Sequence, residues 1–142
     1  MEELLLLSKL IKDQDYNQAL ELVAQLEEMS REDKLSKIYA YTVILLIHLI
    51  KQEAEGRSTR SWEFSIYNSS KEIKKINKRK KTGGFYANQE ELEEILTDAF
   101  DTAIKKAALE AFEGIYSSQE LGEKINAQAI KTKAMTMMVE KS

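Results

Sequence analysis

The chain has a single histidine, His48, which interrupts its longest apolar run, residues 43–50. An imidazole can act as a general base or a metal ligand. A zinc or di-iron site needs three or four ligands on facing helices, and with no cysteine and no second histidine the others would have to be carboxylates. The nearest acidic pair, Glu27 and Glu28, is predicted to lie far from His48. A buried histidine that hydrogen-bonds a neighbour near residues 69–70 is therefore the favoured interpretation.

A basic run covers residues 71–81, with seven lysines or arginines against one glutamate. Such side chains can neutralise nucleic-acid phosphates, and Tyr67, Phe85 and Tyr86 nearby could stack on bases. Alternatively, the cations stabilise the end of a helix and face the acidic residues 90–94 across a hairpin. This second interpretation is favoured. The basic residues are Lys71, Lys74, Lys75, Lys78, Arg79, Lys80 and Lys81.

Few residues outside His48 and the basic run indicate a binding or catalytic site. Met135, Met137 and Met138 could form an adaptable partner surface, a dimer contact, or simply the packed face of a terminal helix. No nucleophile lies beside a base, and Gly83-Gly84 indicates a turn rather than a phosphate-binding loop. We therefore expect no catalytic residue, metal or cofactor.

Helices must position all of these residues, because the chain has no proline and only five glycines. Apolar residues recur at three- and four-residue spacing, and no segment shows strict alternation. The pattern predicts an all-α bundle of five to six helices, with a turn near Ser30 and a central buried helix at about residues 31–55. The other helices are expected over residues 3–11, 15–29, 61–81, 88–113 and 117–139, with N-caps at Asp15, Ser30, Ser61, Asn88 and Ser117.

The length of 142 residues, with 43% hydrophobic and 32% charged residues, predicts one globular domain over residues 1–142. A net charge of −3 argues against a general polyanion binder. The apolar run is shorter than the roughly 20 residues that span a bilayer, so no membrane segment is expected. The acidic N-terminus is unlike a signal peptide, and the lack of cysteine suits a cytoplasmic location.

Residues 22–31, 45–51 and 60–62, followed by Ser65-Ile66 and Ile73, resemble in order and spacing the all-helical domain-of-unknown-function family 29, which is widespread in cyanobacteria and found in other prokaryotes. The resemblance covers about residues 1–113 and leaves an extra amphipathic helix at about 117–140. It implies a helical bundle and no established reaction. The motif positions, of unknown role, are His48, Lys51, Arg60, Ser61 and Trp62.

One of the chain's departures from this family bears on a possible site. A glutamate pair of the family is replaced by Ala24-Gln25, so a site built on that pair would be absent or altered. We expect a non-enzymatic interaction or assembly protein that self-associates into a homo-oligomer. Nucleic-acid binding through residues 71–81 is the alternative, and a metal or hydrolytic site at His48 is a third, weaker hypothesis.

Overall fold

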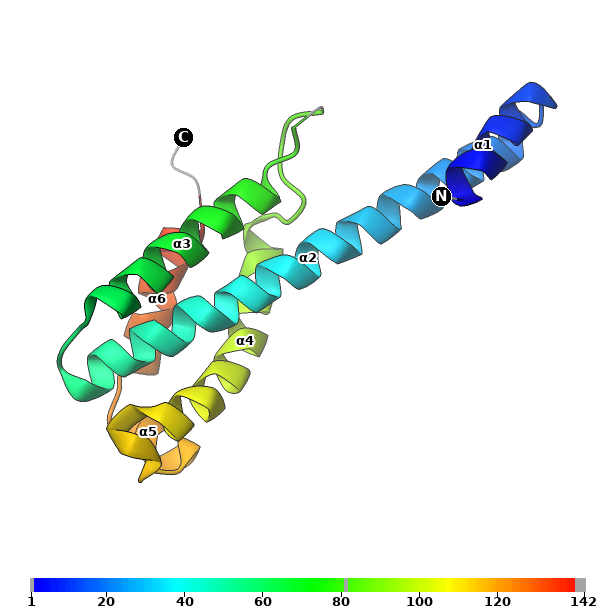
Figure 1. The fold of residues 1–142 in the computed structure, drawn as a ribbon. Helices are drawn as coiled ribbons and strands as arrows, with labels where there is room; N and C mark the ends of the chain where they lie inside the picture. Colours follow the sequence, from blue (N-terminus) through cyan, green and yellow to red (C-terminus); the bar gives the residue numbers. More distant parts are fainter. Residues whose placement is uncertain (1, 81, 140–142) are drawn as a thin grey trace. The chain divides into compact units, whose positions relative to one another are not determined.

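The computed structural model describes residues 2–80 and 82–139 (Figure 1). Within these ranges the protein is helical and has no strand, which confirms the predicted all-α class. The elements are α1 (Glu2–Lys12), α2 (Tyr16–Glu55), α3 (Arg60–Asn77), α4 (Gln89–Glu110), the 3-10 turn η1 (Ala111–Gly114), α5 (Ser118–Glu123) and α6 (Ala127–Met138).

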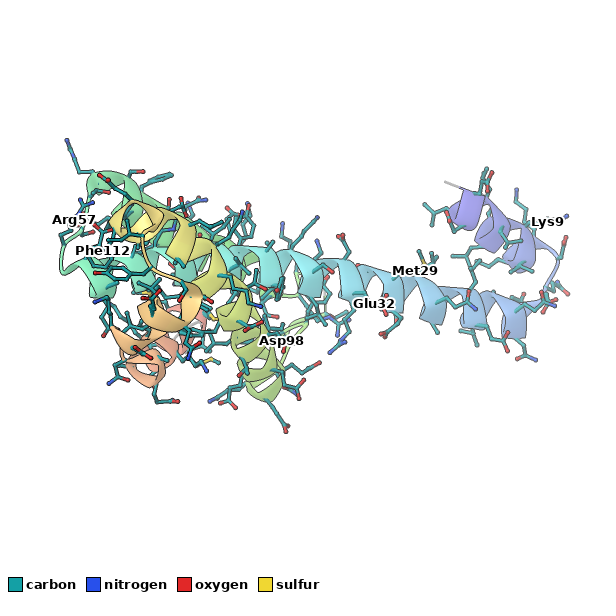
Figure 2. All side chains as sticks on the ribbon, turned by 90° about the horizontal axis from the view of Figure 1, so that it is seen from below. Lys9, Met29, Glu32, Arg57, Asp98 and Phe112 are labelled. Carbon is teal, nitrogen blue, oxygen red and sulfur yellow. The ribbon has the colours of Figure 1, made fainter. Side chains whose placement is uncertain are left out.

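The chain divides into two compact units at the boundary between Lys34 and Leu35. The first unit contains α1 and the beginning of α2, joined by a short turn in which Gln14 has a φ of 60°. The predicted cap at Asp15 is present, because its carboxylate accepts a hydrogen bond from the main chain of Gln18 at 3.3 Å. The side chains of Lys9 and Met29 are exposed to solvent (Figure 2). That the two units together form the single domain predicted over residues 1–142 stays a prediction.

The predicted turn near Ser30 is wrong. Residues 16–55 form one continuous helix of 40 residues. A serine followed by an acidic residue marks a place where a helix can begin, but it does not force the preceding helix to end. No proline or glycine lies between Tyr16 and Glu55, so the intrahelical hydrogen bonds continue through Ser30. The predicted central helix is therefore the second part of α2.

The second unit contains the hydrophobic core, and the apolar run of α2 lies inside it. Leu45, Leu46 and Ile50 are completely buried, whereas Ile44 is 38% exposed. The helix predicted to be buried therefore has one side open to solvent at the apolar run. On α4 the fully buried Ala103 and Ala107 allow other helices to approach closely. Helix α6 packs against both α3 and α4.

The C-terminal methionines contribute to this core. Met138 is buried, and Met135 and Met137 are partly buried against the same cluster. This supports the packing interpretation of these residues over an exposed partner surface. The single helix predicted over residues 117–139 is wrong, because the chain breaks between α5 and α6 and restarts with Asn126 as the N-cap.

The predicted N-caps at Asn88 and Ser117 are confirmed, and each is part of a capping box. The Asn88 side chain accepts a hydrogen bond from the main chain of Glu91, whose carboxylate accepts one in return, and Ser117 and Glu120 do the same. Hydrogen bonds from the main chain and hydroxyl of Ser117 lower the pKa of Glu120. The predicted cap at Ser61 is wrong, since Thr59 caps α3 instead.

Candidate functional site

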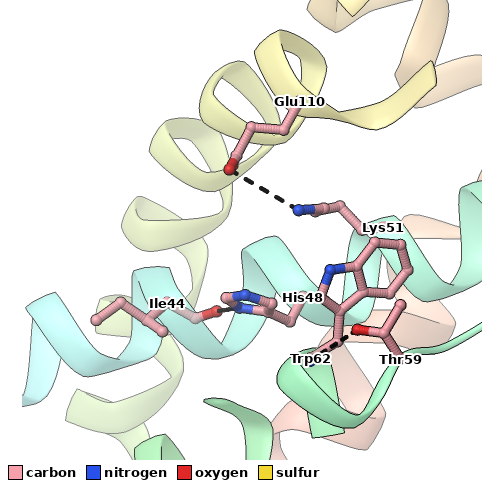
Figure 3. Close-up of polar contacts among 6 residues, drawn as sticks. All are labelled: Ile44, His48, Lys51, Thr59, Trp62 and Glu110. Carbon is pink, nitrogen blue, oxygen red and sulfur yellow. Dashed lines mark hydrogen bonds and ion pairs between the residues drawn. The ribbon is translucent and has the colours of Figure 1, made fainter. Parts of the chain in front are cut away.

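The end of α2 and the start of α3 bring two of the predicted motif positions together (Figure 3). Gly56, with a φ of 65°, turns the chain between the two helices. The Thr59 hydroxyl then accepts a hydrogen bond of 3.1 Å from the main chain of Trp62 and fixes the first turn of α3. The Lys51 ammonium lies 4.8 Å from the centre of the Trp62 ring, and the Arg57 guanidinium lies 4.7 Å from it. We call Lys51, Trp62, Arg57 and Glu110 the tryptophan cluster.

Lys51 is the unusual member, because only 8% of the residue is exposed. A buried ammonium is costly unless other groups compensate its charge. Here the face of the Trp62 ring and the carboxylate of Glu110, whose Oε1 lies 3.8 Å from Nζ, provide that compensation. Glu110 is half-exposed at the end of α4. The tryptophan cluster thus joins α2, α3 and α4.

Sequence reasoning did not single out Glu110 or Arg57. Glu110 comes from a distant part of the chain and has no sequence pattern that distinguishes it from other helical glutamates. Arg57 lies in the predicted loop, and its proximity to Trp62 was the one usable signal. Its guanidinium also binds the carboxylate of Glu55 at 3.0 Å.

His48 is half-buried one turn before Lys51 (Figure 3). Its Nδ1 lies 2.8 Å from the carbonyl oxygen of Ile44, which can only accept a hydrogen bond, so Nδ1 carries the proton. In a neutral imidazole this bond selects the tautomer whose lone pair is on Nε2. The partner is therefore the preceding turn of α2 rather than a residue near positions 69–70; Ser70 instead bonds the carbonyl of Ile66.

The other two motif positions, Arg60 and Ser61, are exposed in the first turn of α3 and lie outside the tryptophan cluster. Among the residues that the structure describes, no three histidine, aspartate or glutamate side chains gather to hold a metal ion. The hypothesis of a metal site at His48 gains no ligand set from the described part of the chain. Similarly, no helix within the described ranges is long and apolar enough to cross a membrane.

The basic run forms a different structure from the one predicted. Helix α3 ends at Asn77 instead of continuing to residue 81, because the buried Asn77 side chain bonds the main chain of Ala87. Its Nδ2 donates to the Ala87 carbonyl at 3.2 Å, and its Oδ1 accepts from the Ala87 amide at 2.7 Å. Arg79 and Gly84 are also joined by a main-chain hydrogen bond. Lys78, Arg79 and Lys80 are exposed and lie in the closed loop that results, whose described residues 78–80 and 82–86 we call the basic loop. Lys81 lies outside the described residues.

The exposed face of α3 leads directly into this loop. Arg60, Phe64, Tyr67, Lys71 and Lys75 follow one another at helical spacing, and all are exposed. We call these five residues the outer stripe of α3. The half-buried Lys74 lies beside the stripe. The spacing of four, three and four residues from Arg60 through Tyr67 to Lys71 could have identified Phe64 from the sequence.

The acidic residues 90–94 begin α4 immediately after the basic loop. Glu90, Glu93 and Glu94 are exposed and line a shallow depression together with Thr97 and Asp98. The predicted neutralisation of the basic run by this segment stays a prediction.

Comparison with known families places this geometry in context. The model of the family described as Domain of unknown function DUF29 matches residues 5–128. The chain belongs to the DUF29 family. The match includes the tryptophan cluster, the outer stripe and the basic loop of this DUF29 protein, and it ends at the start of α6. Comparisons with curated proteins and with solved structures found no match.

Proposed function

We propose that this DUF29 protein is a non-enzymatic helical assembly protein that self-associates, and that two copies meet through α1. The observation that carries the proposal is the exposure of α1, in which no residue is buried. Leu5 is 73% exposed, Ile11 is 50% exposed, and Leu4 and Leu6 are each 48% exposed. Exposure of several large apolar side chains on one helix is typical of interaction sites. An isolated helix of this length is also marginal in water, so a partner would stabilise it.

The charges of α1 support a second copy of the same helix as the partner. Glu2 and Glu3 lie in its first turn, and Lys9 and Lys12 lie in its last turn. Two copies packed antiparallel would place each acidic end beside the basic end of the other. A parallel pair would place like charges together, which costs free energy. The antiparallel pair has two-fold symmetry, the commonest symmetry of soluble oligomers.

Sedimentation velocity of the full chain over a range of concentrations tests self-association. We expect a dimer that dissociates on dilution. Leu5→Glu should shift the protein to monomer, because it places a carboxylate in the apolar contact. Leu109→Glu is the matched control, since Leu109 is 76% exposed on α4, and it should leave the dimer intact. A wild-type protein that remains monomeric at roughly 100 μM would overturn the proposal.

Charge exchange tests whether the charged ends of α1 lie at the contact between the two copies. An all-acidic α1 (Lys9→Glu with Lys12→Glu) and an all-basic α1 (Glu2→Lys with Glu3→Lys) should each be monomeric alone. An equimolar mixture should form a one-to-one dimer. Circular dichroism would check that both variants remain helical, because the new charges oppose the helix dipole by a few tenths of a kcal/mol. Failure of the mixture to associate would exclude this pairing of α1.

We also propose that the protein works in the cytoplasm, a location that its lack of cysteine suits. Cell fractionation of the source organism would check this, and recovery of the protein in an extracytoplasmic fraction would contradict it.

A further inference from the structure

The outer stripe of α3 combines two kinds of side chain that a solvated helix face rarely combines. Its residues lie opposite the buried side of the helix, which carries Trp62, Ile66 and Ile73. The cations Arg60, Lys71 and Lys75 are ordinary for such a position. The aromatic residues Phe64 and Tyr67 are not required by the core and need another explanation.

Phe64 is 64% exposed and Tyr67 is 60% exposed. Their ring centroids lie 6.4 Å apart, with an angle of 43° between the planes. They are the exposed large hydrophobic residues of α3, so no large aliphatic side chain of this helix is exposed beside them. Open aromatic faces are platforms on which unpaired bases can stack.

Cations accompany these rings along the surface. The Lys71 ammonium lies 5.9 Å from the centre of the Tyr67 ring. In the basic loop, the Arg79 guanidinium lies 5.5 Å from the Tyr86 ring, and Phe85 is 52% exposed. From Arg60 to Lys75 the stripe is about 22 Å long, at 1.5 Å per residue. Helix α3 ends two residues after Lys75, at Asn77, where the basic loop begins. Aromatic platforms interleaved with cations are the usual surface for a single strand, whose phosphates the cations neutralise.

We propose that the outer stripe of α3 and the basic loop bind single-stranded nucleic acid. This function is separate from self-association through α1. A duplex fits less well, because paired bases do not offer their faces to Phe64 and Tyr67. A membrane surface would require a broad apolar face, which the stripe lacks. An acidic protein segment would satisfy the cations but would leave the aromatic faces unused.

Fluorescence anisotropy of the full chain with a labelled oligothymidylate of roughly 20 nucleotides tests this proposal. We expect micromolar or tighter binding at roughly 50 mM salt that weakens steeply by roughly 200 mM salt. A duplex of the same length should bind at least about tenfold more weakly. Absence of binding at the lower salt concentration, or equal binding of the duplex, would overturn the proposal. Binding to anionic phospholipid vesicles but not to the oligonucleotide would do the same.

Paired variants locate the site. Phe64→Ala with Tyr67→Ala should weaken binding by at least about tenfold, with little change in its salt dependence. Lys71→Ala with Lys75→Ala should also weaken binding, but it should reduce the salt dependence by about one phosphate contact per lysine. Leu109→Ala with Ile115→Ala and Lys105→Ala with Lys106→Ala are the matched controls, since all four residues are exposed elsewhere. Equal losses in the control and stripe variants would overturn the assignment.

Discussion

At the scale of single residues, Lys51 shows how a buried charge can be tolerated at a family motif position. Its ammonium is compensated by the Trp62 ring and by Glu110, and Glu110 itself keeps contact with water. The two partners of this ion pair are therefore not equivalent. Removal of the exposed carboxylate leaves a buried charge, whereas removal of the lysine leaves a carboxylate that water can solvate.

We expect Glu110→Gln to lower the free energy of unfolding by about 1–2 kcal/mol and Lys51→Met by less than about 1 kcal/mol. The double variant should be no less stable than Lys51→Met alone, because no buried charge then remains. Urea unfolding monitored by Trp62 fluorescence would measure these values. Glu123→Gln, at an exposed glutamate, is the control. Equal losses for Glu110→Gln and Glu123→Gln would contradict the role given to Glu110.

Gly114 shows a second kind of constraint on a single residue. It has a φ of 79°, and a Cβ built on it would lie 2.9 Å from the carbonyl oxygen of Leu109. Gly84 has a similar φ of 77° but open space around it. Gly84→Ala should lower the free energy of unfolding by about 1–2 kcal/mol, because alanine is strained in a left-handed backbone. Gly114→Ala should cost about 1–3 kcal/mol more, because the main chain must also move. Urea unfolding of both variants measures the difference, and equal costs would contradict the close approach.

At the scale of the elements, the sequence predicted best what is decided locally. The capping boxes at Asn88 and Ser117 depend on side chains three residues apart, and both are present. The predicted turn at Ser30 was wrong, because a residue that can cap a new helix does not by itself end the helix that precedes it. The choice of Thr59 over Ser61, two hydroxyl residues only two positions apart, depends on how the loop before α3 is placed.

The candidate site could be predicted only in part for the same reason. The resemblance identified Lys51 and Trp62, which the turn at Gly56 brings together, and also Arg60, which begins the outer stripe. It could not supply Glu110, whose contact with Lys51 depends on the packing of α4. The end of α3 at Asn77 depends equally on a contact with Ala87 across the basic loop. Contacts between elements leave no local pattern in the sequence.

Asn77 provides a direct test of how the basic loop is held. Asn77→Ala would leave the buried amide and carbonyl of Ala87 without their side-chain partner. We expect a loss of about 2–4 kcal/mol in the free energy of unfolding, since each orphaned group costs about 1–3 kcal/mol. Thr82→Ala, in the exposed part of the same loop, should cost less than about 0.5 kcal/mol. Thermal unfolding followed by circular dichroism compares them, and similar stabilities would show that the loop does not depend on Asn77.

At the scale of the whole molecule, burial is distributed unevenly between the two units. Among the described residues before Leu35 only Ala19 is buried, whereas the second unit carries the hydrophobic core. Local opening needs less free energy where fewer apolar contacts are lost. The amides of α1 should therefore exchange with solvent faster than those of residues 43–50. Equal protection of the two segments in dilute protein would contradict this expectation.

The same measurement connects this uneven stability to self-association. Association through α1 stabilises the helix by mass action, so its protection should rise between roughly 1 μM and roughly 100 μM protein. The core segment 43–50 should change little, because its exchange is limited by opening of the second unit. Hydrogen exchange with mass spectrometry resolves the two segments as separate peptides. Leu5→Glu should remove the concentration dependence of α1, whereas Leu109→Glu should preserve it. A dimer in which α1 remains unprotected would show that the copies meet through another surface.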